Sequence, residues 1–277
     1  GIHKEGTAYS NEGRFFDANF VRFRSGFPEK MGGWVKKYTS SFIGTCRKIK
    51  QWVSLTGTKY IALGTTKKTY IIQGTTFVDV TPIRATTSAG DATFSASDGS
   101  STVTVNETGH NAVEGDFVTF SGAASLGGNV TADVLNQEYE ILAISSANAF
   151  TITAKDTSGT TVTANASDSG NGGSSTVAAF QISIGEDVAV PGGGWGAGTW
   201  SSGTWGTAVG DDVTNTLRLW SLDNFGEDLV MNPRLGGIYF WDATNPTTRA
   251  KELSTIAGAI DPPSEALQIV VSTQDRH

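Results

Sequence analysis

Few residues of this chain have the types and spacing that chemistry at an active site requires. A Gly-x-Ser-x-Gly nucleophile elbow does not occur in the sequence. The acidic pairs Glu186-Asp187 and Asp211-Asp212 consist of adjacent residues, which face opposite sides of a strand. Three histidines are far apart, with no pair at metal-ligand spacing: His3, His110 and His277. We therefore predict no catalytic residue, no metal site and no cofactor, and hence no enzyme.

The segment Gly64-Thr65-Thr66-Lys67-Lys68-Thr69 superficially resembles a phosphate-binding loop. Such a loop has a glycine directly before its lysine and is followed by a helix. Here Thr66 precedes Lys67, and the residues after Lys68 are typical of a strand. We therefore predict that this segment is a hairpin turn.

Basic side chains gather near the start of the chain. Residues 1–84 carry 14 basic and 5 acidic side chains, a net charge of +9, whereas residues 85–277 carry 6 and 22, a net charge of −16. An acidic partner for the basic part would be nucleic acid or the acidic half of a neighbouring copy. The alternative is a solvated face on which lysines protect exposed strand edges. The candidate residues are Arg22, Arg24, Lys36, Lys37, Arg47, Lys48 and Lys50.

Residues 191–210 are rich in glycine and place a tryptophan at every fifth position, at Trp195, Trp200 and Trp205. Neither a helix nor a strand has a period of five, so we predict a loop that displays indole rings. Because three indoles are costly to leave in water, we expect the loop to dock on another surface. A plain linker is the alternative.

Short apolar stretches separated by turn residues predict an all-β fold. Apolar residues make up 38% and charged residues 17% of the sequence, and glycine, with 34 residues, is abundant. Four candidate strands at 47–55, 59–63, 68–72 and 77–80 have the size of one β-propeller blade. Further candidates in the middle of the chain suit a small β-sandwich or barrel: 102–105, 117–120, 139–144, 150–153 and 161–163.

We thus expect propeller-like meander blades that are interrupted by an inserted small β-sandwich or barrel domain. Residues 1–84 would form an N-terminal arm and the first meander, residues 85–188 the inserted all-β domain, and residues 189–212 the Gly/Trp-rich loop. Residues 213–277 would continue the meanders, with a strand at 267–271. Because fewer than three blades cannot close a propeller, we expect the chain to be part of a longer protein that is incomplete at its C-terminus here.

The remaining sequence features exclude several classes of protein. A single cysteine, Cys46, excludes a disulfide framework and a cysteine-rich zinc site within one chain. No apolar run reaches the length of about 18 residues that a membrane-spanning helix needs, and no apolar signal-peptide core follows the N-terminus.

Two passages resemble tail proteins of short-tailed bacteriophages. Val21–Trp34, which reads VRFRSGFPEKMGGW, resembles the opening of these proteins, and Arg218–Leu229, which reads RLWSLDNFGEDL, resembles a second passage of theirs. The Gly/Trp loop at 192–206 has the same character. The resemblance covers about 26 residues and implies a tail hub, nozzle or packaged-DNA stabilisation protein, and members of that family are considerably longer than this chain.

The resemblance implies a structural virion protein below the portal and adaptor, made in the host cytoplasm. Its partners would be further copies in a six-fold ring, the head–tail adaptor, other tail proteins and, through non-specific contact, phage DNA. Such a ring would close and conduct the DNA exit channel. A host-surface or glycan-binding tail module is the alternative, and a polysaccharide depolymerase is a third hypothesis.

Overall fold

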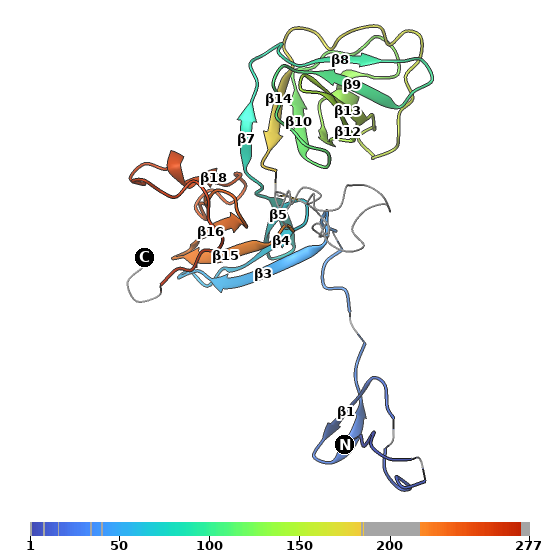
Figure 1. Ribbon diagram of the computed structural model, residues 1–277, viewed down its shortest axis with the longest axis vertical. Helices are drawn as coiled ribbons and strands as arrows, with labels where there is room; N and C mark the ends of the chain where they lie inside the picture. The colour runs from blue at the N-terminus through green and yellow to red at the C-terminus, as the bar shows by residue number, and fades with distance from the viewer. Residues whose placement is uncertain are drawn as a thin grey trace, which may run out of the picture. The chain divides into compact units, whose positions relative to one another are not determined.

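The computed structural model describes residues 2–7, 9–15, 17–33, 35–39, 41–183, 185 and 217–272, and it confirms the all-β fold. Every pairing between strands is antiparallel, and no sheet in these residues closes into a barrel (Figure 1). Helical structure there consists of α1 (Ala132–Leu135) and the 3-10 turn η1 (Leu253–Thr255). No helix in the described part is long and apolar enough to cross a membrane. The chain divides into two compact units, Gly1–Ser41 and Phe42–His277.

The first unit is organised around a hairpin of β1 (Val21–Arg24) and β2 (Phe27–Lys30). Ser25 and Gly26 connect the strands, and both have positive φ, as a type I′ turn requires. The Arg22 guanidinium bonds the carboxylate of Glu29 across the two strands at 2.9 Å. The passage VRFRSGFPEK therefore encodes a complete two-stranded hairpin.

The second unit contains two four-stranded meanders, each with its strands in sequence order. The first comprises β3 (Cys46–Val53), β4 (Lys59–Thr65), β5 (Thr69–Gln73) and β6 (Thr76–Asp79). The second comprises β15 (Trp220–Phe225), β16 (Asp228–Pro233), β17 (Tyr239–Trp241) and β18 (Lys251–Glu252). Thr66, Lys67 and Lys68 form the turn between β4 and β5, so the prediction of a hairpin turn at this position is confirmed.

One aromatic core joins the two meanders. Trp52 and Tyr60 of the first sheet stack with ring centroids 5.4 Å apart, and Trp241 of the second sheet packs edge-on against Tyr60 at 5.6 Å. Trp220 lies directly on the backbone of Gly64 and donates from Nε1 to the carbonyl oxygen of Thr65 at 2.7 Å. Because a Cβ at residue 64 would lie 2.4 Å from Trp220 Cγ, this contact requires glycine.

The residues between β6 and β15 form two further four-stranded sheets. One has the order β11-β10-β14-β7 and the other the order β12-β13-β9-β8. Their strands are β7 (Ile83–Thr86), β8 (Thr93–Ala96), β9 (Thr102–Asn106), β10 (Phe117–Ser121), β11 (Glu138–Glu140), β12 (Ala143–Ser146), β13 (Ala149–Thr153) and β14 (Val177–Gln181). Phenylalanines from both sheets meet in one core, where Phe94 packs on Phe120 at 5.0 Å and Phe150 on Phe180 at 5.8 Å. We call these two layers the inserted sheets.

Three predicted strands differ from the structure. The stretch 139–144 is divided between β11 and β12, which belong to different sheets. Residues 161–163 contribute only an isolated bridge, between Lys155 and Thr161. Residues 267–271 form no strand, because Ile269 and Val271 donate their backbone N–H groups to the Ser221 and Asp223 side chains. The predicted domain boundaries and the propeller arrangement stay predictions.

The carboxylate of Asp168 ties the irregular part of the inserted sheets together. Asp168 is 4% exposed and accepts four backbone N–H bonds of 2.8 to 3.0 Å, from Gly128, Asn129, Val130 and Asn165. Burial by itself would raise the pKa of Asp168, but these N–H donors outweigh it and lower the pKa. One buried anion therefore fixes two loops that have no regular secondary structure.

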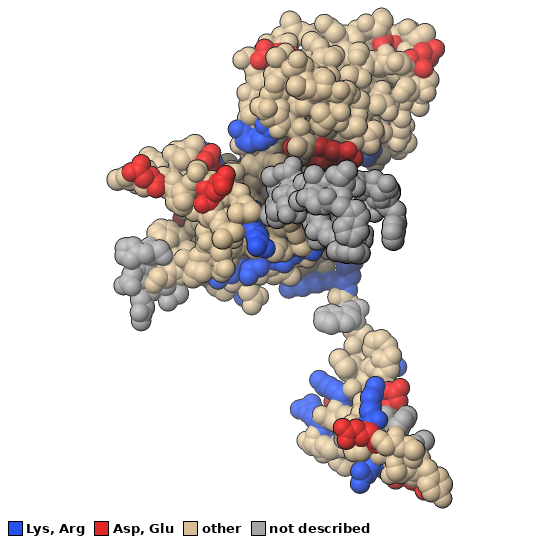
Figure 2. All heavy atoms as spheres, viewed as in Figure 1, with Lys and Arg blue, Asp and Glu red and all other residues tan. Residues whose placement is uncertain are grey.

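The outer face of the first sheet, opposite the aromatic core, is apolar and borders on basic residues. Ile49 and Val53 of β3 are 62% and 58% exposed, and Leu55 in the following turn is 97% exposed. Lys59 is paired with Val53 across the strands and lies on the same face, whereas Lys48 is paired with Gly64 and lies on the inner face with Trp52. Figure 2 shows lysine and arginine side chains along this part of the molecule.

Replacing Gly64 by alanine tests the contact between the two meanders. We expect Gly64→Ala to lower the free energy of unfolding by about 3 kcal/mol, because Trp220 must leave its position. Thermal unfolding followed by tryptophan fluorescence measures the change. The matched control is Gly33→Ala, where a Cβ meets no atom within 4 Å; an equal loss in both variants would contradict the contact.

Replacing Asp168 by asparagine tests the buried anion. We expect Asp168→Asn to lose about 3 kcal/mol at pH 7, because an amide nitrogen then faces N–H donors. The pKa of Asp168 is lowered in the folded state, so its contribution is present above the ordinary value of about 3.9 and is lost as pH falls through the folded value.

Urea denaturation at several pH values measures both effects. The difference in unfolding free energy between wild type and Asp168→Asn should become smaller in acid. The control Asp98→Asn, at an exposed position, should have the unfolding free energy of wild type at every pH. A gap that does not change with pH would mean that the carboxylate charge is not what stabilises the loops.

Candidate functional site

A buried lysine lies where the two meanders and the inserted sheets meet. The Lys68 side chain is 2% exposed, and its Nζ bonds Asp79 Oδ2 of β6 at 2.7 Å. The same ammonium bonds Glu138 of β11 and lies 4.6 Å from the centre of the Phe117 ring. Phe117 and Glu138 belong to the inserted sheets, whereas Lys68 and Asp79 belong to the first meander. A single buried charge therefore connects these two parts of the chain.

Arg249 extends this cluster to the second meander, just before β18. Its Nη2 lies 3.2 Å from Glu138 Oε1, and its Nη1 lies 3.4 Å from Asp79 Oδ1 and 2.9 Å from the carbonyl oxygen of Thr81. Gln181 of β14 also donates to Glu138 Oε1. We call Lys68, Asp79, Glu138 and Arg249 the Lys68 network; it contains two positive and two negative side chains.

Burial and the charges of the network shift the pKa values of Asp79 and Tyr70. Burial by itself would raise the pKa of Asp79, but Lys68 and Arg249 outweigh it and lower the pKa. Burial, together with the carboxylates of Asp79 and Glu138, raises the pKa of Tyr70 to about 12. The Tyr70 hydroxyl is therefore neutral at physiological pH, and it accepts the backbone N–H of Ile43 at 3.2 Å.

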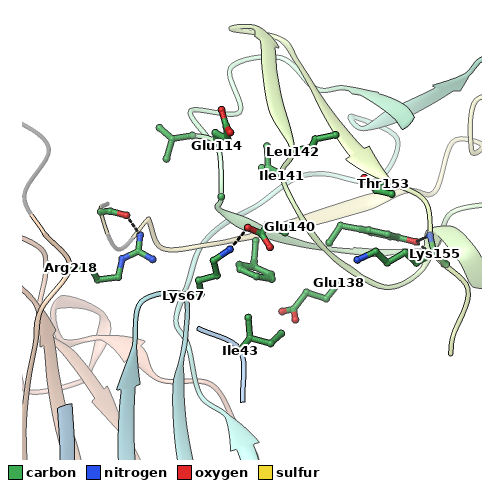
Figure 3. A pocket seen from close by; sticks show the side chains of 15 residues that line it. Ile43, Lys67, Glu114, Glu138, Glu140, Ile141, Leu142, Thr153, Lys155 and Arg218 are labelled. Atoms are coloured by element: carbon green, nitrogen blue, oxygen red, sulfur yellow. Dashed lines mark hydrogen bonds and ion pairs between the residues drawn. The ribbon is translucent and has the colours of Figure 1, made fainter. Parts of the chain in front are cut away.

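A cleft of about 920 Å³ borders the network. The charged side chains that line it have both signs: Lys67, Glu114, Glu138, Glu140, Lys155 and Arg218. Figure 3 shows Lys67 and Glu140 facing one another as an ion pair, with Glu114 above this pair and Lys155 to its right in the view. Arg218 donates to the backbone carbonyl oxygens of Thr66 and Gly185.

Glu138 and Glu140, two of the carboxylates that line this cleft, are poorly suited to acid–base chemistry. Both oxygens of Glu138 accept bonds from cations, and Glu140 is paired with Lys67. A general acid or base must be able to exchange a proton with a substrate, which a carboxylate held by cations does poorly. Among the described residues, no group of three or more His, Cys, Asp or Glu side chains could hold a metal ion.

The predicted basic residues are divided between the two units. Arg22 and Arg24 lie on β1, and Lys36 and Lys37 lie in the segment that follows the hairpin. The other three candidates, Arg47, Lys48 and Lys50, lie on β3 of the second unit. Their role as a site stays a prediction. Trp195, Trp200 and Trp205, the predicted docking residues, lie outside the described part of the chain.

Several of these basic side chains are engaged within the chain. Lys50 Nζ bonds Asp223 Oδ1 of β15 at 2.7 Å, and Lys36 Nζ donates to the carbonyl oxygen of Thr39 at 3.1 Å. Lys37 Nζ lies 5.6 Å from the centre of the Tyr38 ring. The sequence does not predict the Lys68 network, because Glu138 and Arg249 are distant from Lys68 along the chain.

The passage at 218–229 forms the seam between the two meanders. Asp223 bonds Lys50 of β3, and Glu227 accepts the Trp52 Nε1–H on its carbonyl oxygen at 2.8 Å. Glu227 Oε1 also accepts the backbone N–H of Leu55 at 2.7 Å. Asp228 Oδ1 accepts the backbone N–H of Ala243 within the second meander. The acidic residues of this passage thus bind neighbouring parts of the same chain.

Comparison with known proteins assigns no family. No protein-family model matches the chain, and neither does any curated protein. Among solved structures, the chain is similar to the phage phi92 endosialidase, with 14% sequence identity and a TM-score of 0.27. The similarity covers 82% of this chain and 32% of that one, so the chain spans about a third of the length of the endosialidase. At this TM-score and identity the similarity carries no argument about fold or activity.

Removing the buried cation tests the Lys68 network. We expect Lys68→Met to cost about 3 kcal/mol of unfolding free energy, because Asp79 and Glu138 lose their buried counter-charge. The control is Lys67→Met, which removes a more exposed ion pair with Glu140 and should cost no more than about 1 kcal/mol. Chemical denaturation measures both values, and equal costs would mean that the network does not hold the parts together.

Proposed function

We propose that this chain is a structural component of a bacteriophage tail that forms the nozzle or hub below the portal and adaptor. The observation that carries the proposal is the seam at 218–229. This passage resembles phage tail proteins, and its acidic side chains bind the chain itself. Residues that serve the scaffold in this way suit a structural protein better than an enzyme.

The proposed organisation has two blade-like meanders and one inserted β domain. Residues 1–84 and 213–277 would supply the N-terminal arm and the meanders, and residues 85–188 the inserted domain. The pairing of β7 with β14 supports this division, because the first and last strands of the inserted sheets lie side by side. An insertion of this kind enters and leaves the host fold at one place, so the meanders can pack as if the chain were continuous.

In this proposal the protein is located in the virion and assembles as a six-fold ring with the adaptor and other tail proteins. The ring would close the DNA exit channel before infection and conduct DNA afterwards. Basic residues on β1 and β3 would make non-specific contact with phosphates of phage DNA. No base-reading element is required for that role.

A host-surface or glycan-binding tail module is the second candidate, and the cleft is the observation that favours it. Its volume of about 920 Å³ would accommodate a small sugar, and Glu114 and Lys155 provide polar groups at its wall. In this alternative the exposed carboxylate of Glu114, rather than the paired carboxylates of Glu138 and Glu140, would accept hydrogen bonds from sugar hydroxyls.

Cryo-electron microscopy of tail particles, with mass photometry of the purified protein, tests the proposal. We expect a closed ring at the end of a short tail, with no affinity for host surface glycans, and density that shows whether DNA touches β1 or β3. A monomer that binds glycan, with binding abolished by Glu114→Gln, would replace the proposal with the second candidate. A trimeric spike that projects outward would contradict the nozzle.

A further inference from the structure

Lys68 is a buried nitrogen nucleophile in direct contact with two carboxyl groups. Its side chain is 2% exposed, and its Nζ bonds the carboxylates of Asp79 and Glu138. The same nitrogen lies over the ring of Phe117, 4.6 Å from its centre. Burial penalises charged groups, so an ammonium and a carboxylate in such surroundings are stabilised when both become neutral. An amine and a carboxyl group held together in this way are the reactants of an amide bond.

The two carboxyl groups differ in the bonds that they accept. Asp79 Oδ1 accepts the backbone N–H of Thr81 at 2.9 Å and the Thr81 hydroxyl at 2.6 Å. Burial opposes the charge of Asp79, but Lys68 and Arg249 outweigh it and lower the pKa of this carboxyl. An anion that is stabilised in this way is a poor target for a nucleophile, and it suits the transfer of a proton better.

Glu138 is the better target for attack. Its Oε2 faces Lys68, whereas its Oε1 accepts from Arg249 Nη2 at 3.2 Å and from Gln181. Two donors on one oxygen stabilise the negative charge that develops there when a nucleophile adds to the carboxyl carbon. The carboxyl carbon is one bond beyond the oxygen that Lys68 contacts, so the reacting groups are already brought together.

Glu138 also has a route by which a leaving molecule can depart. Its side chain is 26% exposed and lines the cleft of about 920 Å³ (Figure 3), whereas Asp79 does not line it. A water molecule released at Glu138 would therefore enter the cleft and not remain enclosed in the core.

We propose that Lys68 and Glu138 form a covalent amide bond, which ties the first meander to the inserted sheets. One proton moves along the hydrogen bond from Nζ to Glu138 Oε2, which leaves a neutral amine and a neutral carboxylic acid. The lone pair of Nζ then forms a bond to Cδ, and the bond between Cδ and Oε2 breaks. Asp79 Oδ2 takes a second proton from Nζ and passes it to the departing oxygen, so one water molecule leaves. The third proton stays on the amide nitrogen, and no oxidant or reductant is needed.

The product keeps the remaining groups of the network paired. One positive and one negative charge disappear together, so Arg249 and Asp79 remain as an ion pair. Arg249 and Gln181 can still donate to Oε1, which becomes the carbonyl oxygen of the amide. The inference does not depend on the proposed function, since it concerns contacts within one chain.

The intact mass of the denatured full-length chain tests the inference, measured after purification and again after prolonged incubation. We expect wild type to be lighter than its sequence by the mass of one water molecule. Tandem mass spectrometry of a protease digest should find a branched peptide that joins Lys68 to Glu138. Because these residues are 70 positions apart, the cross-linked chain should also migrate faster than the Lys68→Met variant on a denaturing gel.

Three variants assign the roles of the residues. Glu138→Gln should form the same bond and lose one ammonia molecule in place of water, because the side-chain nitrogen then leaves. Asp79→Ala should keep its full sequence mass, because the second proton has no carrier. The matched control is Lys67→Met, which removes the neighbouring and more exposed ion pair with Glu140 and should lose water like wild type. Near-ultraviolet circular dichroism confirms that each variant is folded.

The mass of wild type decides the question even where a variant does not fold. A wild-type chain that keeps its full sequence mass after incubation would overturn the inference, and so would a branched peptide that joins Lys68 to Asp79. Loss of water that persists in Lys68→Met would also contradict it, because the loss would then arise elsewhere in the chain. A full loss of water in folded Asp79→Ala would contradict the proton transfer assigned to Asp79.

Discussion

The burial of Lys68 is the constraint on which the arrangement of the two meanders and the inserted sheets depends. An ammonium group that is almost wholly removed from water is tolerated only beside carboxylates that bond it. Asp79 supplies one from the first meander and Glu138 another from the inserted sheets, while Arg249 of the second meander bonds both. The first meander supplies one cation and one anion of this network, the inserted sheets supply its second anion, and the second meander supplies its second cation. Displacement of the inserted sheets would leave two cations with one carboxylate, and displacement of the second meander would leave two carboxylates with one cation, which disfavours both arrangements.

The seam between the meanders works on the same principle, with aromatic packing in place of charge. Trp220 can lie on β4 only because residue 64 has no side chain, and its indole N–H is then satisfied by the carbonyl oxygen of Thr65. Trp52 of the first meander in turn donates from its indole Nε1–H to the backbone carbonyl oxygen of Glu227 in the second meander. Each sheet therefore inserts an indole into the other. Shape and hydrogen bonding together fix one relative position of the two sheets.

The strands were largely predictable from the sequence, and the sites were not. Alternating residues and glycine turns are local signals, so the four strands of the first meander and the turn at Lys67 follow from them. Strand assignments were wrong where the local signal competes with tertiary contacts. Residues 267–271 have the apolar character of a strand, yet two of their backbone N–H groups donate to side chains of β15 instead of to a neighbouring strand. The Lys68 network joins residues as far apart in sequence as Lys68, Glu138 and Arg249, and no local pattern encodes that proximity.

The charge asymmetry of the chain has a partly internal explanation. Lys50, Lys67 and Lys68 belong to the basic start of the sequence, and their carboxylate partners Asp223, Glu140 and Glu138 all lie in the acidic remainder. Some of the opposite charges of the two halves therefore form ion pairs within the chain, and these pairs hold the first meander to the rest of the described residues.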